Sequence, residues 1–505
     1  MSLAVHLPIL PIAIPALAAP VALLAMRRRR ALAVGLGFGS CLAMLVTALA
    51  LMARVSDGTI LAYALGDWPA PFGIVLVADR LAAMMLVLTA SLALIALLHA
   101  VVTRADRKGW HFHPLFQFQL MGLNGAFLTG DLFNLFVFFE VLLIASYGLM
   151  LHGQGPARLK AGVQYVVVNL VGSSVFLIAL GMLYALTGTL NMADMGLRVA
   201  AVPAADQGML RIAGLLLVSV FALKAAVAPL HLWLPRTYAV STPAVAALFA
   251  IMTKVGVYAI IRVVPQVFGE GAGAAAWVPA PWMFPAALVS AGIGFAGVFV
   301  ARSLSEQAAY AVIGSTGTLL IAVAAWTPES LGAALYYLAH STLAGAALFL
   351  VADAAARRRG AFGDAASPGP AFAGRGIAAM LFMAAAIAAT GLPPLSGFIG
   401  KLLILQSVAA LPDWGWAWGV ILGTTFIGVI GFARAGSAVF WKTGEGEAPA
   451  ARTYRTDFAA PALALVLLAA LSAGAGWASA YAGAAAAQVL DPARSAAVVL
   501  AEATP

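Results

Sequence analysis

The sequence is short of charge and of cysteine, and each shortage excludes a class of protein. Only 9% of the 505 residues are charged, whereas 63% are hydrophobic. A soluble domain carries about 25% charged residues, so a soluble globular fold is excluded. The single cysteine, Cys41, excludes a disulfide within the chain, an iron–sulfur cluster and a thiolate zinc site.

Candidate ligands for a cofactor are also scarce. Of the seven histidines, only His231 and His340 lie well inside apolar segments, and they form no repeated ligand pattern. We therefore expect no cofactor and no metal centre in the chain itself.

A cleaved signal peptide is not indicated, because Met1–Met26 has no basic stretch before its apolar run and Arg27–Arg30 follow it. This order predicts a retained first helix with its N-terminus outside.

What the chain does have is apolar runs of about 20 residues, which recur to its end. Barrel strands would alternate in polarity, so we predict an all-α integral membrane protein. The predicted spans, fourteen in number, are 5–26, 31–53, 79–102, 112–130, 132–151, 160–187, 209–235, 242–263, 283–301, 305–326, 329–351, 376–408, 414–439 and 457–482. With the N-terminus outside, most basic residues fall in inward loops and few, Arg262 among them, fall outward, which supports this count. The net charge of +9 then reflects topology, and we expect no binding to nucleic acid.

Two of the predicted spans are interrupted by proline. The seventh contains Pro229 in LKAAVAPLHLWLP, and the twelfth contains Pro393 and Pro394 in ATGLPPLSGFIGK. Proline removes a backbone hydrogen bond, and in lipid the freed groups need protein or water as partners. Broken helices at corresponding positions of two halves are typical of transporter repeats. Because the two breaks are an odd number of spans apart, the second copy is predicted to be inverted in the membrane.

Four charged residues inside apolar spans are the strongest functional signal. They are Glu140 in FNLFVFFEVLLIASY, Lys224 in SVFALKAAVAPLHLW, Lys254 in FAIMTKVGVYAII and Lys401 in LPPLSGFIGKLLIL. Each charge costs about 2.5–3.5 kcal/mol near the bilayer centre, so such residues mark proton or ion routes. Burial favours the neutral form of a lysine and a nearby carboxylate favours the charged form. A lysine near Glu140 can therefore bind and release a proton as its partner moves.

Structural readings of the same residues stay open at this point. Buried charges also form ion pairs that lock helices together, and lysines can extend along the helix to the membrane surface. His231 and His340 can relay protons near neutral pH, or they can simply hydrogen-bond neighbouring helices. We expect Asp131 to be an N-cap rather than a proton gate. Arg434 is expected to be a structural counter-charge or a residue that extends to the interface.

Several segments resemble one known family. These are HLWLPRTYAVSTPAVAALFAIMTKVGVYAIIR with FALKAAVAPL before it, FNLFVFFEVLLIASYGLM, RSLSEQAAYAVIGSTG and ATGLPPLSGFIGKLLIL. Over roughly 112–440 the chain resembles the antiporter-like subunits of respiratory complex I, membrane-bound hydrogenases and multisubunit cation/proton antiporters. Within that group, LGDWPAPFGIVLVADRLAAMMLVLT is most similar to the D-type component of the Mrp/Mnh/Pha monovalent cation/proton antiporters.

The resemblance implies a division of the chain and a proton path. It implies two inverted five-helix repeats, helices 4–8 and 9–13, over 111–265 and 280–442. Helices 1–3 precede them in 1–110, and a C-terminal helix with a tail follows in 455–505. Independently of the resemblance, the strand-like residues of Gly58–Val77 around a WPAP turn predict an extracytoplasmic hairpin within 1–110. The implied path runs from Glu140 through Lys224 and Lys254 to Lys401. The implied context is a bacterial inner membrane, with A-, B-, C-, E-, F- and G-type subunits as partners and H⁺ with Na⁺ or K⁺ as substrates.

The chain departs from its relatives in the second repeat. Many of them have a lysine where His340-Ser-Thr-Leu-Ala-Gly-Ala-Ala-Leu-Phe349 has Ala344 or Gly345, and a Lys-Arg pair where this chain has Glu306-Gln307. Here the second half of the path would depend on His340 and water.

Two rivals to the interpretation as a secondary transporter subunit remain. One is the proton-pumping arm of complex I or of a hydrogenase, which belongs to an enzyme, and the other is a scaffold that no longer conducts protons.

Overall fold

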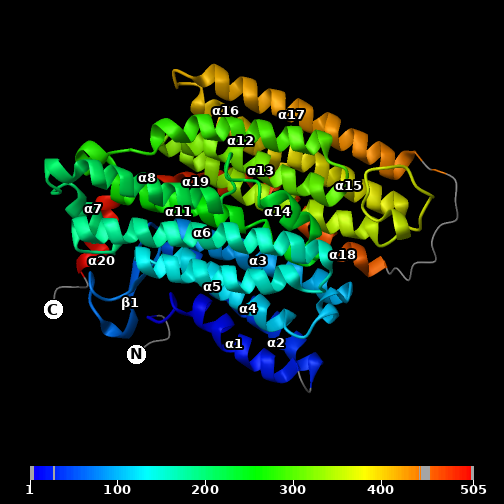
Figure 1. Cartoon of the computed structure of the whole chain (residues 1–505), viewed down its shortest axis with the longest axis horizontal. Helices are drawn as coiled ribbons and strands as arrows, with labels where there is room; N and C mark the ends of the chain where they lie inside the picture. The colour runs from blue at the N-terminus through cyan, green and yellow to red at the C-terminus, as the bar shows by residue number, and fades with distance from the viewer. Residues whose placement is uncertain (1–4, 27–28, 443, 445–454, 502–505) are drawn as a thin grey trace.

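The structure is a computed structural model and describes residues 5–26, 29–442, 444 and 455–501. The predicted inward residues Arg27, Arg28 and Arg452 lie outside the described residues, as do the last four residues of the tail. In the described part, long helices lie side by side, with α1 and α2 at one edge and α16 and α17 at the other (Figure 1). One two-stranded hairpin interrupts this helical pattern.

The bounds of the helices follow the apolar runs closely. In the first part they are α1 (Leu10–Met26), α2 (Arg30–Val55), α3 (Arg80–Val102), α4 (Phe112–Leu128), α5 (Leu132–Leu151), α6 (Pro156–Thr187), α7 (Met192–Val199), α8 (Gln207–Lys224), α9 (Leu234–Val240), α10 (Pro243–Phe249) and α11 (Met252–Phe268). In the second part they are α12 (Ala280–Val300), α13 (Leu304–Val323), α14 (Pro328–Ala356), α15 (Arg375–Thr390), α16 (Ser396–Val408), α17 (Trp414–Gly436), α18 (Ala459–Ala473), α19 (Ala475–Val489) and α20 (Pro492–Ala501).

Ten helical segments of the described chain are long and apolar enough to cross a membrane, and shorter apolar helices accompany them. This confirms the prediction of a multi-pass, all-α membrane protein, whereas the number fourteen stays a prediction. The two proline-containing spans are interrupted, between Lys224 and Leu234 and between Thr390 and Ser396. Between α10 and α11 a turn at Ala250 and Ile251, which includes no proline, interrupts the regular helix. Both residues keep helical backbone angles, and Pro243–Phe268 still forms one membrane-length segment, as the predicted span 242–263 requires.

The buried centre of the molecule is formed by α14 and by the segment α10–α11, whereas less than half of the apolar stretch of α2, α6 or α17 is buried. Glycine lets helices approach closely where lipid offers no hydrophobic driving force. Between α12 and α13, a Cβ atom added at Gly294 would lie 2.1 Å from the backbone nitrogen of Gly314. Glycine at this contact is therefore required by the packing.

One end of the molecule is covered by short elements, and we call it the hairpin end. The strands β1 (Leu61–Ala64) and β2 (Val75–Ala78) pair antiparallel, as expected for this segment. With α7 and α20 they enclose a small second core, which is formed by Ile60, Ala70, Val75, Val77, Ala193, Ala496 and Val499. Figure 1 shows β1, α7 and α20 together at this end.

Candidate functional site

Glu140 and Lys224 are connected through α6. The hydroxyl of Ser173 donates a hydrogen bond to the Glu140 carboxylate. One turn earlier on α6, Oδ1 of Asn169 accepts a hydrogen bond of 3.2 Å from Nζ of Lys224. The ion pairs within 4 Å among the described residues do not include Glu140 with Lys224. Ser173 and Asn169 on α6 therefore lie between the two charges, each bonded to one of them. Sequence reasoning missed both residues because serine and asparagine carry no signal of their own in such helices.

At the break after α8, side chains other than Lys224 bond the free backbone groups, so the Lys224 ammonium is available to bond Asn169. Lys224 is the last residue of α8 and is only 7% exposed. The indole Nε1 of Trp233 donates a hydrogen bond of 3.1 Å to the carbonyl of Leu223, and the hydroxyl of Ser290 on α12 accepts one of 2.9 Å from the backbone nitrogen of Ala228. Since other side chains satisfy these backbone groups, Lys224 turns toward α6.

Lys254 lies at the start of α11, beside the unpredicted turn, and is fully buried. Its Nζ contacts two hydroxyls of α13, at 3.5 Å from Ser315 Oγ and 3.4 Å from Thr316 Oγ1. A Cβ atom added at Gly256 would come within 2.6 Å of the Phe221 carbonyl, so α8 and α11 touch backbone to backbone here. This contact brings the end of α8, with Lys224, next to the start of α11, with Lys254.

Lys401 on α16 has no carboxylate within 4 Å among the described residues. Its Nζ donates hydrogen bonds of 2.8 Å to the carbonyl of Thr390 and 2.6 Å to Thr425 Oγ1, and it lies 5.1 Å from the centre of the Phe295 ring. Thr390 is the last residue of α15, so the lysine satisfies a carbonyl that the broken helix leaves free.

His340 lies between the last two lysines of the predicted path. It is buried on α14, and its Nδ1 is 2.9 Å from Ser396 Oγ at the start of α16. A cavity of about 10 Å³, about enough for one water, is lined by His340, Gly345 and Ser315, the partner of Lys254. The cavity is thus located where relatives were expected to carry a lysine.

The remaining predicted residues lie apart from this group. His231 lies in the break between α8 and α9, and its Nδ1 has no hydrogen-bond partner within the described chain. Asp131 accepts a hydrogen bond of 2.8 Å from the backbone nitrogen of Asn134, which confirms the N-cap. Arg434 donates to the carbonyl of Phe299. Gln307 belongs to the Glu306-Gln307 pair that stands where a Lys-Arg pair was expected. Its side-chain amide donates to the carbonyls of Val298 and Gly431, at 3.1 Å each.

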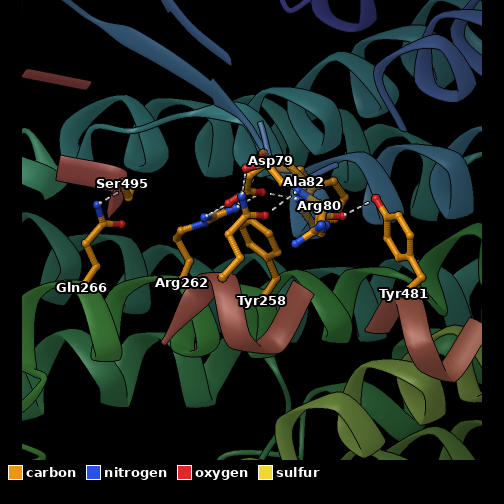
Figure 2. A network of polar contacts seen from close by, with 11 residues as sticks. Asp79, Arg80, Ala82, Tyr258, Arg262, Gln266, Tyr481 and Ser495 are labelled. Atoms are coloured by element: carbon orange, nitrogen blue, oxygen red, sulfur yellow. Dashed lines mark hydrogen bonds and ion pairs between the residues drawn. The ribbon is translucent and has the colours of Figure 1, made fainter. Parts of the chain in front are cut away.

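One buried ion pair is not foreseen from the sequence. The predicted spans place Arg262 among the outward basic residues, but it is buried within α11 and its guanidinium bonds Asp79 at 2.5 and 2.8 Å. Figure 2 shows Arg262 and Tyr258 directed from α11 toward Asp79 at the start of α3. Both oxygens of the Asp79 carboxylate are engaged, so each buried charge has its opposite at hydrogen-bond distance. Because Asp79 also caps α3 through Ala82, its sequence context indicates only a helix start.

Comparisons with known proteins identify the family of the chain. Residues 129–430 match the family described as NADH:quinone oxidoreductase/Mrp antiporter, TM. The D component of a probable K⁺/H⁺ antiporter of Rhizobium meliloti is 40% identical over 88% of both chains, and the D component of the Na⁺/H⁺ antiporter of Bacillus subtilis is 33% identical over 98% of this chain and 99% of its own. A chain of the Mrp complex from Dietzia sp. DQ12-45-1b superposes with a TM-score of 0.87 at 28% identity, over 99% of this chain and 100% of that one.

The chain belongs to this NADH:quinone oxidoreductase/Mrp antiporter family. The resemblance to D-type antiporter components is confirmed, since the relatives from Rhizobium meliloti and Bacillus subtilis both carry that designation.

Proposed function

We propose that the chain is the D-type, proton-translocating component of a multisubunit Na⁺(K⁺)/H⁺ antiporter in a bacterial plasma membrane. Inward proton movement drives cation efflux, and the other subunit types of the complex are its partners. The observation that carries the proposal is the series formed by Glu140 and three buried lysines, each bonded to a polar side chain of a neighbouring helix. Relatives named as components of K⁺/H⁺ and Na⁺/H⁺ antiporters support it.

The first proton transfer takes place around α6. A charged Glu140 favours a protonated Lys224, and the intervening Ser173 and Asn169 set how strongly the two groups interact. When Glu140 loses its charge or α6 shifts, the buried Lys224 favours its neutral form and releases its proton toward Lys254. The close contact of α8 with α11 at Gly256 keeps this step short.

The later transfers pass through hydroxyls and water. From Lys254 the proton reaches the hydroxyls of α13, of which Ser315 also lines the cavity with His340. One water in that cavity would bridge Ser315 and His340. Ser396 then connects His340 with α16, the helix of Lys401.

The same proposal assigns topology and repeats. The N-terminus and the hairpin end face outward, which follows from the excess of basic residues in the opposite loops. The two inverted repeats extend over 111–265 and 280–442, with α4–α11 as the first half and α12–α17 as the second. The interruptions after Lys224 and after Thr390, one in each half, support this division.

A second candidate is the proton-pumping subunit of a respiratory complex. The family description covers NADH:quinone oxidoreductases as well as antiporters, and the buried series does not distinguish the two. Genes for small hydrophobic antiporter subunits beside this one would favour the antiporter, whereas genes for iron–sulfur, quinone-reducing subunits would favour the pump.

Vesicles that contain the whole complex test the proposal. Fluorescence dequenching after addition of Na⁺, K⁺ or Li⁺ reports antiport and identifies the cation. We expect Lys224→Ala and Glu140→Ala to abolish dequenching while the complex still assembles. Lys160→Ala, which changes an exposed lysine on α6, is the control and should retain activity. Antiport that persists in either variant of the buried pair would refute the mechanism.

A further inference from the structure

A polar stripe on α11 connects Lys254 with the hairpin end. Lys254, Tyr258, Arg262 and Gln266 are spaced four residues apart, so they share one face of the helix. The stripe covers about 18 Å at 1.5 Å per residue. Its first three members are buried and the last is partly exposed. The stripe therefore extends from the middle lysine of the relay to the surface.

Hydrogen bonds fix each member of the stripe in place. The hydroxyl of Tyr258 donates to the carbonyl of Phe127 at 2.6 Å and accepts from Arg262 Nε at 3.1 Å. The rest of the guanidinium is occupied by Asp79, as Figure 2 shows. Around this pair, Tyr481 of α19 donates to the backbone carbonyl of Arg80 at 3.1 Å, so one further titratable side chain, that of Tyr481, lies close by.

A cavity of about 420 Å³ adjoins the outer end of the stripe. Gln266 lines it, together with Trp277, Trp326 and two alanines of α20, and Glu270 is the carboxylate at its wall. Many waters fit into this volume, since one needs only about 10–15 Å³. Water from the hairpin-end surface can therefore reach Gln266, one turn from Arg262.

We propose that this stripe is a proton route between the hairpin end and Lys254, and that the Arg262–Asp79 pair is its gate. The proposal rests on the proposed function and adds a point of access from outside. An arginine does not release its proton at ordinary pH. The Arg262 guanidinium bonded to Asp79 therefore cannot transfer a proton along the stripe to Lys254. Its fixed positive charge also repels an incoming proton. The route opens when Arg262 moves away from Tyr258, and Asp79 holds it closed.

A second buried ion pair lies outside the stripe. Arg358, which follows the end of α14, bonds Asp457, which lies before α18, at 3.3 Å, and both side chains are buried. This pair lies on other helices than the stripe, near the opposite end of α14 from the hairpin end. It therefore offers a matched control for the loss of a buried ion pair.

Proton leak is the measurement that separates a gate from a structural contact. The assembled complex is reconstituted in vesicles that contain a pH-sensitive dye, and decay of an imposed pH gradient is followed without Na⁺ or K⁺. Asp79→Asn with Arg262→Gln retains hydrogen bonding but removes both charges, and we expect at least a five-fold faster leak than in the wild type. Asp457→Asn with Arg358→Gln should leave the leak unchanged. An assembled gate variant with wild-type leak would overturn the proposal.

Tyr258→Phe tests the stripe if the double variant fails to assemble. This change keeps the ring and removes only the hydroxyl between Lys254 and Arg262, so antiport should fall at least three-fold without a leak. Unchanged antiport would overturn the route. Lys224→Ala separates this inference from the proposed function: if it abolishes antiport while the gate variants behave as wild type, only the gate is refuted.

Discussion

The two broken helices look alike in sequence but use their lysines differently. In the first half, Trp233 satisfies the carbonyl of Leu223 before the break, and Lys224 reaches across to Asn169. In the second half, Lys401 itself satisfies the carbonyl of Thr390 before the break. A lysine beside a membrane-buried proline can thus serve as an exchangeable proton carrier or as the cap of the helix end.

The difference extends to the partners of each lysine. On the far side of α6, Glu140 provides a negative charge that can change the protonation of Lys224. Lys401 has only neutral acceptors and an aromatic ring among its contacts in the described chain. A neutral lysine can still donate to both acceptors, so the helix end remains capped when Lys401 loses a proton. We infer that the first half sets the proton affinity and the second half mainly transmits the proton.

The largest effect should come from breaking the connection on α6. Asn169→Leu removes the acceptor of Lys224, and a hydrogen bond to a charged group is worth about 1.5–3 kcal/mol. We expect antiport to fall at least ten-fold with normal assembly. Dequenching assays on vesicles measure this, with Ser174→Ala as the control because Ser174 is exposed and bonds only its own helix. Wild-type rates in Asn169→Leu would mean that Glu140 and Lys224 act independently of α6.

A smaller loss is expected in the second half. Lys401→Met keeps the length of the side chain but removes the proton carrier and the cap, so antiport should decrease by about ten-fold, as for one hydrogen bond of a charged group. Thr425→Val removes only one of the two acceptors and should have a weaker effect. Both rates and the thermal stability of the complex are measured. If Lys401→Met lowers stability but not the rate, Lys401 is only a helix cap and the path ends before it.

Two adjacent serines on α6 refine the comparison within the first half. Ser173 donates to Glu140, whereas Ser174 points to the surface and donates to the carbonyl of Leu170. Ser173→Ala should reduce antiport about three- to ten-fold and change its pH profile, since one neutral donor to a carboxylate is lost. Ser174→Ala should do neither. Equal behaviour of the two variants would remove Ser173 from the mechanism.

The sequence reveals charges and prolines in the membrane because both are costly there. For that reason Glu140, the lysines and the breaks near Pro229 and Pro393 are visible without a structure. Serine, threonine and asparagine cost little, so the partners of these charges become visible only in three dimensions. The turn between α10 and α11 contains no proline, and no local signal marks it.

Arg262 shows a second limit of sequence reasoning. Its position near the end of a predicted span suggests a loop, and only the fold brings Asp79, 183 residues earlier, against it. The spacing of Lys254, Tyr258 and Arg262 is the one available signal. It indicates a shared helix face, but it does not identify what that face meets.

The smallest effect concerns a contact that joins α2 to α4 at the end opposite the hairpin. There Asp106, in the turn Ala105–Lys108 before α4, contacts Arg30 of α2 and bonds His113 of α4 at 3.1 Å. Burial by itself raises the pKa of Asp106. The hydrogen bonds from His113 and Arg30 together outweigh this effect, so the pKa lies below its ordinary value of 3.8. A lowered carboxyl pKa stabilises the fold above about pH 4, and this contribution is lost as pH falls through the folded-state value.

Asp106→Asn should therefore lower the unfolding temperature of the purified complex by a few degrees at neutral pH and leave the antiport rate nearly unchanged. The difference from the wild type should shrink below pH 4, because the native carboxylate then gains a proton too. Asp413→Asn, at an exposed carboxylate, controls for the loss of one negative charge. A constant difference across pH would show that Asp106 contributes through packing and not through its charge. A lost antiport rate would instead place this contact between α2 and α4 within the proton path.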